Sequence, residues 1–281
     1  MKIAFVTNPK HPEIEDDDRP LAQALARRGA IVLTASWDDP DFAWDRVDLA
    51  LLRSPWDYHR RCEEFLGWLA RAEAVTTVVN DPEVVRWNIN KRYLRELADK
   101  GVPTVPTAFV SRGESANLQD LCAARGWATV VLKPSISADS WETIRVTPDR
   151  HAEGQAYLDR HRPDREIMVQ PFVKDVEERG EHSLMLFGGV YSHAVRKNSA
   201  FQGGRHVGPE GRTSDPGPDG LEMARDVLAR AGFPQIPYAR VDIARDDSGA
   251  PLLLELELFE PTLFFREMPG SEEALARVLM P

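Results

Sequence analysis

The sequence predicts an α/β protein with a parallel sheet in its first third and antiparallel strands towards its C-terminus. Two observations predict this fold class. Within residues 1–84, short apolar runs alternate with amphipathic segments, a pattern typical of β-α units in a parallel sheet. Further along, apolar runs follow each other across the turns Gly188-Gly189 and DDSG (246–249), which is typical of antiparallel hairpins.

The N-terminal part alternates predicted strands with predicted helices. The strands are 2–6, 31–36, 47–53 and 75–81, and the helices are 20–30 and 62–73. Gly29 is placed to end the first helix, because glycine readily adopts the left-handed conformation found there. The acidic run EIEDDDR (13–19) falls in the first strand-to-helix loop, where it is either a solvated turn or part of a ligand-binding edge.

The rest of the chain contains mostly predicted strands. They are 106–110, 129–135, 166–173, 182–189, 190–197, 238–245 and 251–259, with helices at 88–101 and 220–233. Residues 198–219 are rich in glycine and proline, so we expect a mobile loop there.

Composition and charge narrow the classes of function. The net charge of −10 over 281 residues argues against nucleic-acid or membrane-surface partners, which need clustered Lys and Arg. No apolar stretch is long enough to span a membrane, and the run after MK is too short for a signal peptide. Cys62 and Cys122 match no metal or disulfide spacing. We therefore expect a cytoplasmic protein.

The stretch LLLELELFEPTLFF (252–265) places carboxylates on a strand that otherwise reads as core. Alternation puts Leu254, Leu256 and Leu258 on one face and Glu255 and Glu257 on the other. Across the DDSG turn, Asp242 faces the same side as the two glutamates. Three converging carboxylates predict a magnesium site. The alternative is a strand with one solvated face.

Two lysines extend this interpretation. Lys91 opens the predicted helix 88–101, and Lys133 ends the apolar run of VVLKP. A lysine at the end of an apolar strand needs an anion, and a polyphosphate is one candidate.

The order of these motifs resembles the ATP-grasp ligases, in particular their glutathione-synthetase and RimK-like branch. The matching segments are WNINK, VLKP, MVQPFV, VDI and ELELFEPT, over about residues 80–265. The resemblance implies an ATP-grasp fold: a substrate-side pre-ATP-grasp domain at 1–84 and an ATP-grasp region at 85–281. Within that region it implies a small lid subdomain at about 105–173 and a metal- and substrate-binding subdomain at 174–281.

The resemblance also implies roles for individual residues. ATP would be held at its phosphates by Lys91 and Lys133, at adenine by a hinge of Gln170, Phe172 and Val173, and at ribose by Glu181. Mg²⁺, with Mn²⁺ as a substitute, would be held by Asp242, Glu255 and Glu257. Arg240 matches the arginine that D-alanine:D-alanine ligases place beside the reacting carboxylate, where it would stabilise the tetrahedral intermediate. A plain ion pair with a neighbouring glutamate is the alternative for Arg240.

Two segments depart from the family pattern. The loop after the VLKP lysine is usually glycine-rich, but here it reads SISADSW (135–141), where the hydroxyls of Ser135, Ser137 and Ser140 are candidate substitutes for backbone amides. Related ligases carry an arginine soon after the phenylalanine of NSAFQGGR (198–205). That position is Gln202 here, and Arg205 is the candidate replacement.

The substrate side is predicted from strand ends. RSPWDYHRR (53–61) follows a strand, so Arg53 and Ser54 could bind a carboxylate and Asp57 an ammonium group. The alternative is a packed loop with Trp56 as a plug. Arg196 and Lys197 would add positive charge near the phosphates or the acceptor carboxylate, unless they form a solvated strand end.

Together these features predict an ATP- and Mg²⁺-dependent carboxylate–amine ligase that forms an acyl phosphate on a small amino-acid-like substrate. WDYHRR, WNINKRYL, HAVRK and ELELFEP also resemble the ATP-grasp cyclo-ligases that form D-cycloserine from an O-ureidoserine, which implies an intramolecular reaction and antibiotic biosynthesis. A non-catalytic ATP-binding module and an ATP-grasp kinase stay open as alternatives. A homodimer or homotetramer is compatible with the family.

Overall fold

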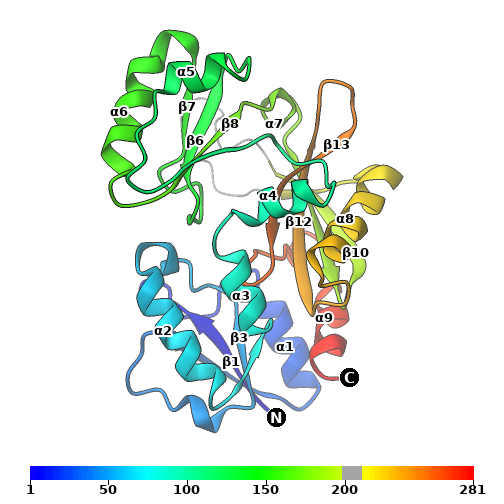
Figure 1. Ribbon diagram of the computed structural model, residues 1–281. Helices are drawn as coiled ribbons and strands as arrows, with labels where there is room; N and C mark the ends of the chain where they lie inside the picture. The colour runs from blue at the N-terminus through cyan, green and yellow to red at the C-terminus, as the bar shows by residue number, and fades with distance from the viewer. Residues whose placement is uncertain (198–210) are drawn as a thin grey trace.

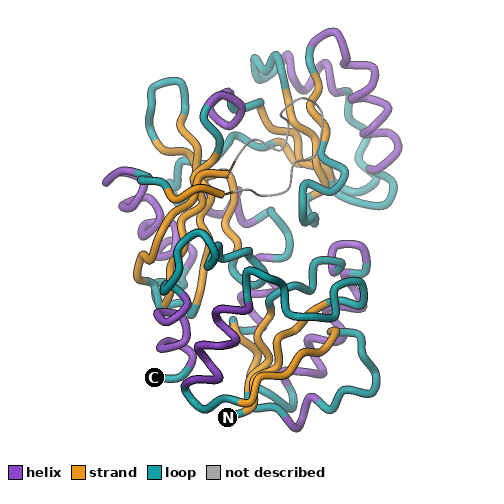
Figure 2. Tube along the Cα trace, turned by 180° about the vertical axis from the view of Figure 1, so that it is seen from behind, coloured by secondary structure: helices purple, strands orange, loops and turns teal. Residues whose placement is uncertain are grey.

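The computed structural model describes residues 1–197 and 211–281, and within these residues the strands form three sheets (Figure 1). The sheet at the N-terminal end is parallel, and the other two are antiparallel. Seen from behind, the strands form three separate groups (Figure 2). The predicted fold class is confirmed.

The parallel sheet has the strand order β2-β1-β3-β4. Its strands are β1 (Lys2–Thr7), β2 (Ile31–Ser36), β3 (Leu49–Leu52) and β4 (Thr77–Val79), and its helices are α1 (Arg19–Arg27) and α2 (Cys62–Glu73). Gly29 follows α1 with a φ of 90°, as expected for a residue that ends a helix. Because β1 and β3 are parallel neighbours, the loops that follow them, 8–18 and 53–57, meet at one edge of the sheet.

The predicted helix 88–101 is wrong in its first part. The structure has two short helices there, α3 (Pro82–Asn88) and α4 (Tyr93–Asp99). Between them, the backbone N–H of Lys91 donates to the carbonyl of Ser135 (2.8 Å), and that of Arg92 donates to Asn90 Oδ1 (3.0 Å). These groups are thereby taken out of a helical ladder, so Lys91 lies in a turn rather than at a helix start.

The second sheet has the order β5-β8-β6-β7. Its elements are β5 (Ala108–Val110), α5 (Leu118–Ala123), β6 (Val130–Pro134), β7 (Ile144–Val146), α6 (His151–His161) and β8 (Ile167–Pro171). Leu118 and Leu158 of the two helices share one apolar cluster with Val130 and Val169 of the strands. The helices and β7 were not predicted from the sequence.

The third sheet has the order β11-β10-β9-β12-β13. This part of the chain comprises α7 (Lys174–Glu178), β9 (Glu181–Phe187), β10 (Val190–Lys197), β11 (Gly211–Thr213), α8 (Gly217–Ala231), β12 (Tyr238–Arg245) and β13 (Pro251–Glu257). Both predicted hairpins are confirmed. The predicted loop 198–219 is wrong at its end, where β11 and the start of α8 form, and residues 198–210 lie outside the described part.

The C-terminal helix α9 (Glu272–Leu279) packs against α1, so the two ends of the chain lie near each other (Figure 1). Phe5 and Leu25 share a buried cluster with Phe187 and Leu275, which joins the parallel sheet to the third sheet. The predicted domain boundaries stay predictions. In the described residues, no helix has both the length and the apolar composition of a membrane span.

Candidate active site

A cavity of about 270 Å³ lies between the second and third sheets, and Trp56 borders it from the loop after β3. Most of the predicted site residues meet in this cavity. Those that line it are Lys91, Lys133, Gln170, Phe172, Val173, Glu181, Lys197, Arg240, Asp242, Glu255 and Glu257. They come from segments that are far apart in the sequence, and the fold brings them together.

A bulge between β12 and β13 decides which side chains of β13 face the cavity. Asp242 pairs with Glu255, but its neighbour Ile243 pairs with Leu253, so Leu254 is the additional residue. Leu253 and Leu256 are buried in the core, whereas Leu254 lines the cavity beside Glu255. The prediction that Leu254 shares a face with Leu256 is therefore wrong, because the bulge interrupts the alternation.

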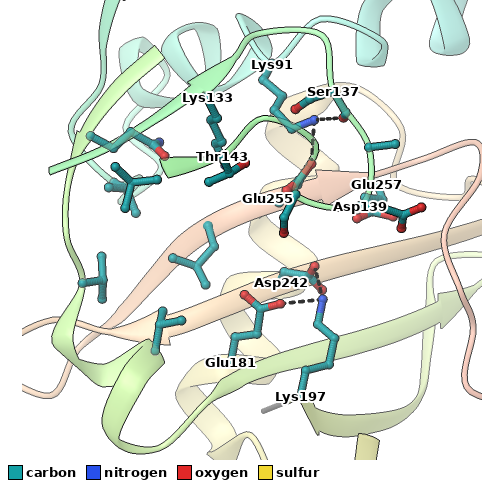
Figure 3. Close-up of a pocket in the computed structure, with 18 of the residues that line it drawn as sticks. Lys91, Lys133, Ser137, Asp139, Thr143, Glu181, Lys197, Asp242, Glu255 and Glu257 are labelled. Carbon is teal, nitrogen blue, oxygen red and sulfur yellow. Dashed lines mark hydrogen bonds and ion pairs between the residues drawn. The ribbon is translucent and has the colours of Figure 1, made fainter. Parts of the chain in front are cut away.

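Each of the predicted metal-binding carboxylates forms an ion pair with a cation of the chain. Figure 3 shows the pairs of Glu255 with Lys91 and of Asp242 with Lys197. Lys91 Nζ lies 3.0 Å from Glu255 Oε1. Asp242 lies 2.9 Å from Arg240 Nε and 3.0 Å from Lys197 Nζ. Glu257 pairs with Arg240, so the ion pair expected as the alternative for Arg240 is present. The cavity floor is thus a network of alternating charges.

Burial raises the pKa of these carboxyl groups, whereas the nearby cations lower it. Burial raises the pKa of Glu257 to about 7, despite the nearby Arg240. Burial also raises the pKa of Asp242, but Arg240 and Lys197 outweigh it and hold this pKa below the usual range. Lys91 and Lys133 likewise keep the pKa of Glu255 low in spite of burial. Among these three carboxylates, Glu257 is therefore the one whose negative charge the chain's own cations compensate least.

The donor set fits a hard divalent cation, since it consists of carboxylate oxygens on adjacent strands. Within residues 1–197 and 211–281, however, no three His, Cys, Asp or Glu side chains are arranged as a metal-binding group. The cations Lys91, Lys197 and Arg240 contact the carboxylates there. The metal-binding role of Asp242, Glu255 and Glu257 stays a prediction.

The predicted adenine-binding residues lie at the end of β8. Gln170 is 6% exposed, and its Nε2 donates to Thr107 Oγ1 (2.9 Å), which fixes the side chain. The guanidinium of Arg145 stacks over the ring of Phe172 at 3.8 Å, so one face of that ring is covered.

The two predicted phosphate-binding lysines are held differently. Lys91 Nζ contacts Glu255 and donates to the carbonyl of Ser137 (2.6 Å). Lys133 makes no ion pair in the described residues, and burial lowers its pKa. Because Lys133 lines the cavity and is not directly paired with a carboxylate of the described residues, it is a candidate to bind an anion.

The glycine-free loop after β6 rests on the N-terminal part of the protein. Trp141 packs against His59 with tilted rings (centroids 4.8 Å apart), and Arg165 lies over its ring at 4.7 Å. Asp139 and Glu142 have φ values of 50° and 51°, a left-handed conformation that non-glycine residues rarely adopt. Of the hydroxyls considered as phosphate ligands, those of Ser137 and Ser140 belong to residues that line the cavity, whereas Ser135 is buried outside it.

The substrate-side residues predicted in the loop after β3 do not line this cavity. Arg53 is 1% exposed and pairs with Asp18 (2.9 Å), and it borders a second cavity of about 280 Å³. Ser54 is buried beside it. Asp57 accepts a hydrogen bond from Trp37 Nε1 (2.8 Å), an arrangement typical of a packed loop. Their substrate roles stay predictions.

The remaining predicted residues lie on or after β10. Arg196 donates to His182 Nε2 (3.0 Å) and does not line the cavity, unlike Lys197. Arg205 lies outside the described residues. Several cavity residues were not among the predicted site residues, and they are Trp56, Asp139, Thr143, Glu260 and Thr262. Glu260 and Thr262 lie in the quoted stretch 252–265, where their position just after the glutamates was the available signal.

Known structures identify the class of protein. The structure matches the crystal structure of D-cycloserine synthetase DcsG with a TM-score of 0.92 and 30% identity, over 99% of this chain and 98% of the other. It matches a RimK domain protein ATP-grasp from Sphaerobacter thermophilus with a TM-score of 0.70 and 18% identity, over 100% of both chains. The fold is that of the ATP-grasp ligases.

Sequence comparison identifies the family within this class. The chain is 32% identical to the cycloserine biosynthesis protein DcsG of Streptomyces lavendulae, over 93% of this chain and 92% of the relative. A family profile described as the N-terminal domain of D-cycloserine synthetase DcsG matches residues 3–80. The chain belongs to the DcsG family of ATP-grasp ligases, and it is an ATP-dependent ligase.

Proposed function

We propose that this protein activates the carboxylate of a small amino-acid derivative as an acyl phosphate and closes it onto a nitrogen of the same molecule. The observation that carries the proposal is the convergence of Lys91, Lys133 and Arg240 with the β12 and β13 carboxylates in one cavity. The substrate class is supported by the likeness to D-cycloserine synthetase, because the product named there is a small cyclic amide.

In the first step, an oxygen of the substrate carboxylate attacks the γ-phosphorus of ATP, the bond to the β-phosphate oxygen breaks, and ADP leaves. Lys133 and Lys91 stabilise the charge on the phosphate oxygens, since both are cations that line the cavity. Asp242, Glu255 and Glu257 would hold Mg²⁺, which supplies further charge neutralisation at the phosphates when it is bound. Binding of the phosphates replaces part of the ion pairing of Lys91.

In the second step, a nitrogen of the substrate attacks the acyl carbon and loses its proton, and inorganic phosphate leaves. Arg240 is 6% exposed and is oriented by Asp242 and Glu257, so its charge is fixed in direction. A guanidinium held in this way stabilises the oxyanion of the tetrahedral intermediate without reorganisation. No side chain needs to form a covalent bond, so catalysis depends on positioning and charge.

Isotope transfer tests the acyl phosphate directly. The protein is incubated with ATP, Mg²⁺ and O-ureidoserine carrying ¹⁸O in its carboxylate, in separate D and L preparations. We expect ADP, phosphate that contains ¹⁸O, and a ring product identified by mass spectrometry as cycloserine or its N-carbamoyl form. Release of AMP and pyrophosphate, or unlabelled phosphate, would contradict the acyl phosphate.

The same experiment separates the alternatives. A stable phosphorylated product would indicate a kinase, and ATP binding without phosphate release would indicate a binding module. A product that joins two substrate molecules would indicate ordinary ligation and would contradict ring closure while leaving the acyl phosphate in place.

A further inference from the structure

Glu260 is a buried carboxyl group in the cavity that the proposed reaction does not use. It follows β13 and is 9% exposed. The hydroxyl of Tyr58 donates a hydrogen bond to its carboxyl group, and Trp56 Nε1 donates to its backbone carbonyl (3.1 Å). Both contacts come from the loop after β3, so Glu260 lies where the N-terminal part borders the cavity.

The other carboxylates on the strands around the cavity are paired with cations. Glu181 and Asp242 contact Lys197, Glu255 contacts Lys91, and Glu257 contacts Arg240. In residues 1–197 and 211–281, Glu260 makes no ion pair with a lysine or arginine. Burial raises its pKa well above the usual range, and nearby Glu257 and Asp139 raise it further. A cation bound at this position would offset both effects.

The backbone of residues 260–262 is rigidly held. The three consecutive carbonyl groups of this segment each accept a hydrogen bond from a different side chain. The donors are Trp56 to Glu260 (3.1 Å), Arg53 to Pro261 (2.7 Å) and Arg240 to Thr262 (3.3 Å). A carboxyl group on a segment fixed in this way is preorganised for a ligand.

The same hydrogen bonds relate Glu260 to the reacting carbonyl. Arg240, which we place beside the tetrahedral intermediate, is bonded to the carbonyl of Thr262, two residues from Glu260. In an α-amino acid, the ammonium nitrogen and the carboxylate carbon are bonded to the same atom. A group that binds the ammonium must therefore lie close to the group that contacts the carbonyl.

We propose that Glu260 binds the α-ammonium group of the substrate and thereby selects amino acids over carboxylic acids that lack the amino group. This inference rests on the proposed function, because it assumes that the carboxylate of the same molecule is activated. Tyr58 is then a positioning residue, since it orients the Glu260 carboxylate through a hydrogen bond.

A thermodynamic cycle of two enzymes and two substrates tests the contact between Glu260 and the ammonium group. The kcat/KM of the wild type and of Glu260→Gln is measured with O-ureidoserine and with 3-(ureidooxy)propanoate, which lacks only the amino group. We expect the wild type to prefer the amino compound by about 100-fold, because a buried charge pair is lost with the analogue. In Glu260→Gln we expect this preference to fall to below about 5-fold, with little change for the analogue.

Control variants locate the effect. Glu267→Gln changes a partly buried glutamate that lines neither cavity, and it should keep the full preference. Glu260→Asp keeps the charge and should keep most of the preference, which also covers the case that Glu260→Gln does not fold. Asp17→Asn probes the second cavity, which shares Trp56 and Thr262 with the first. Loss of the preference in Asp17→Asn, with retention in Glu260→Gln, would overturn the proposal.

Two further results would also overturn it. One is an unchanged preference in Glu260→Gln. The other is a loss of kcat that is equal for both compounds, which would indicate a role in proton transfer. Calorimetric titration of both compounds in the presence of ADP reads the contact without turnover. If the proposed reaction fails but the wild type still binds the amino compound about 100-fold more tightly than Glu260→Gln does, the ammonium contact stands alone. Equal affinity of the wild type and Glu260→Gln for the amino compound would reject the ammonium contact.

Discussion

Lys133 at the end of β6 and Glu260 after β13 are groups of opposite charge that line the same cavity, and they differ from their neighbours in the same way. Lys91, Lys197, Arg240 and four carboxylates neutralise one another through ion pairs. In the described residues, Lys133 and Glu260 have no such partner. Burial lowers the pKa of Lys133 and raises that of Glu260, so in both cases it favours the neutral form. The comparison teaches that charged groups paired with one another form the lining of the cavity. Charged groups without an ion-pair partner in the described residues are the ones from which we infer the charge of the ligand groups.

The surroundings of the two groups differ as well. Lys133 lies beside the loop 135–141, whose backbone includes left-handed residues and whose outer contact is an aromatic pair. Glu260 lies in a segment whose carbonyls are tied to arginine and tryptophan side chains. Lys133 thus lies next to backbone in a rarely adopted conformation, whereas Glu260 lies in a segment held by side-chain donors.

The largest effect is expected from a substitution that breaks the network of ion pairs in the cavity. Glu255→Gln removes the partner of Lys91 and a predicted Mg²⁺ ligand, so we expect ATP-dependent phosphate release to fall by about 10³-fold or more. Circular dichroism should show an unchanged fold. Glu222→Gln on the exposed face of α8 is the matched control and should keep full activity. Full activity in Glu255→Gln would remove the metal-binding role from this carboxylate.

The second effect tests how firmly the N-terminal side is held. Asp18→Asn leaves the charge of Arg53 buried without its partner, and we expect a loss of about 3 kcal/mol in the free energy of unfolding. Asp16→Asn, in the same loop, breaks an exposed pair with Arg19 and should change stability by less than about 0.5 kcal/mol. Urea unfolding of both variants measures the difference. Similar losses would mean that the buried pair is not what fixes Arg53.

The smallest effect concerns the contact between the loop 135–141 and the N-terminal part. Burial, with the adjacent Arg60, lowers the pKa of His59 to about 4 from 6.5. The folded state thus binds fewer protons than the unfolded state below pH 6.5, so this contribution to stability is lost as pH falls from 6.5 towards 4.

Because His59 is partly exposed, we expect the loss to amount to only about 1 kcal/mol. It should appear as a steeper fall in stability between pH 7 and pH 5 for the wild type than for His59→Gln. Urea midpoints at the two pH values measure it. Parallel curves would show that His59 does not titrate differently in the two states.

Much of the fold was predictable because local patterns agree with the tertiary structure. β12 begins and ends at the predicted residues, 238 and 245, since a turn and a change of pattern mark both sides. α6 was missed because its sequence is polar and contains Gly154. Packing explains that glycine: a Cβ there would collide with Leu118 of α5. The helix is thus specified by a contact between elements rather than by its own sequence.

The position of cavity residues was predictable where a charged side chain interrupts an apolar strand, as for Lys133 and Glu255. It was not predictable where partners come from distant loops. The Asp18–Arg53 pair joins the loops after two neighbouring strands, and nothing in the sequence around either residue indicates the other as its partner. The bulge that turns Leu254 towards the cavity depends on the register of β12, which alternation alone does not define.

Trp141 links two events that are chemically separate. The loop that carries it lines the cavity through Ser137 and Ser140, and its indole rests on His59 beside the loop that holds Glu260. Any widening of the cavity through this loop must separate the indole from the imidazole. Under the proposed function, spent nucleotide and the next substrate would both pass this one ring contact, so a variant that loosens it would change the rate of product release.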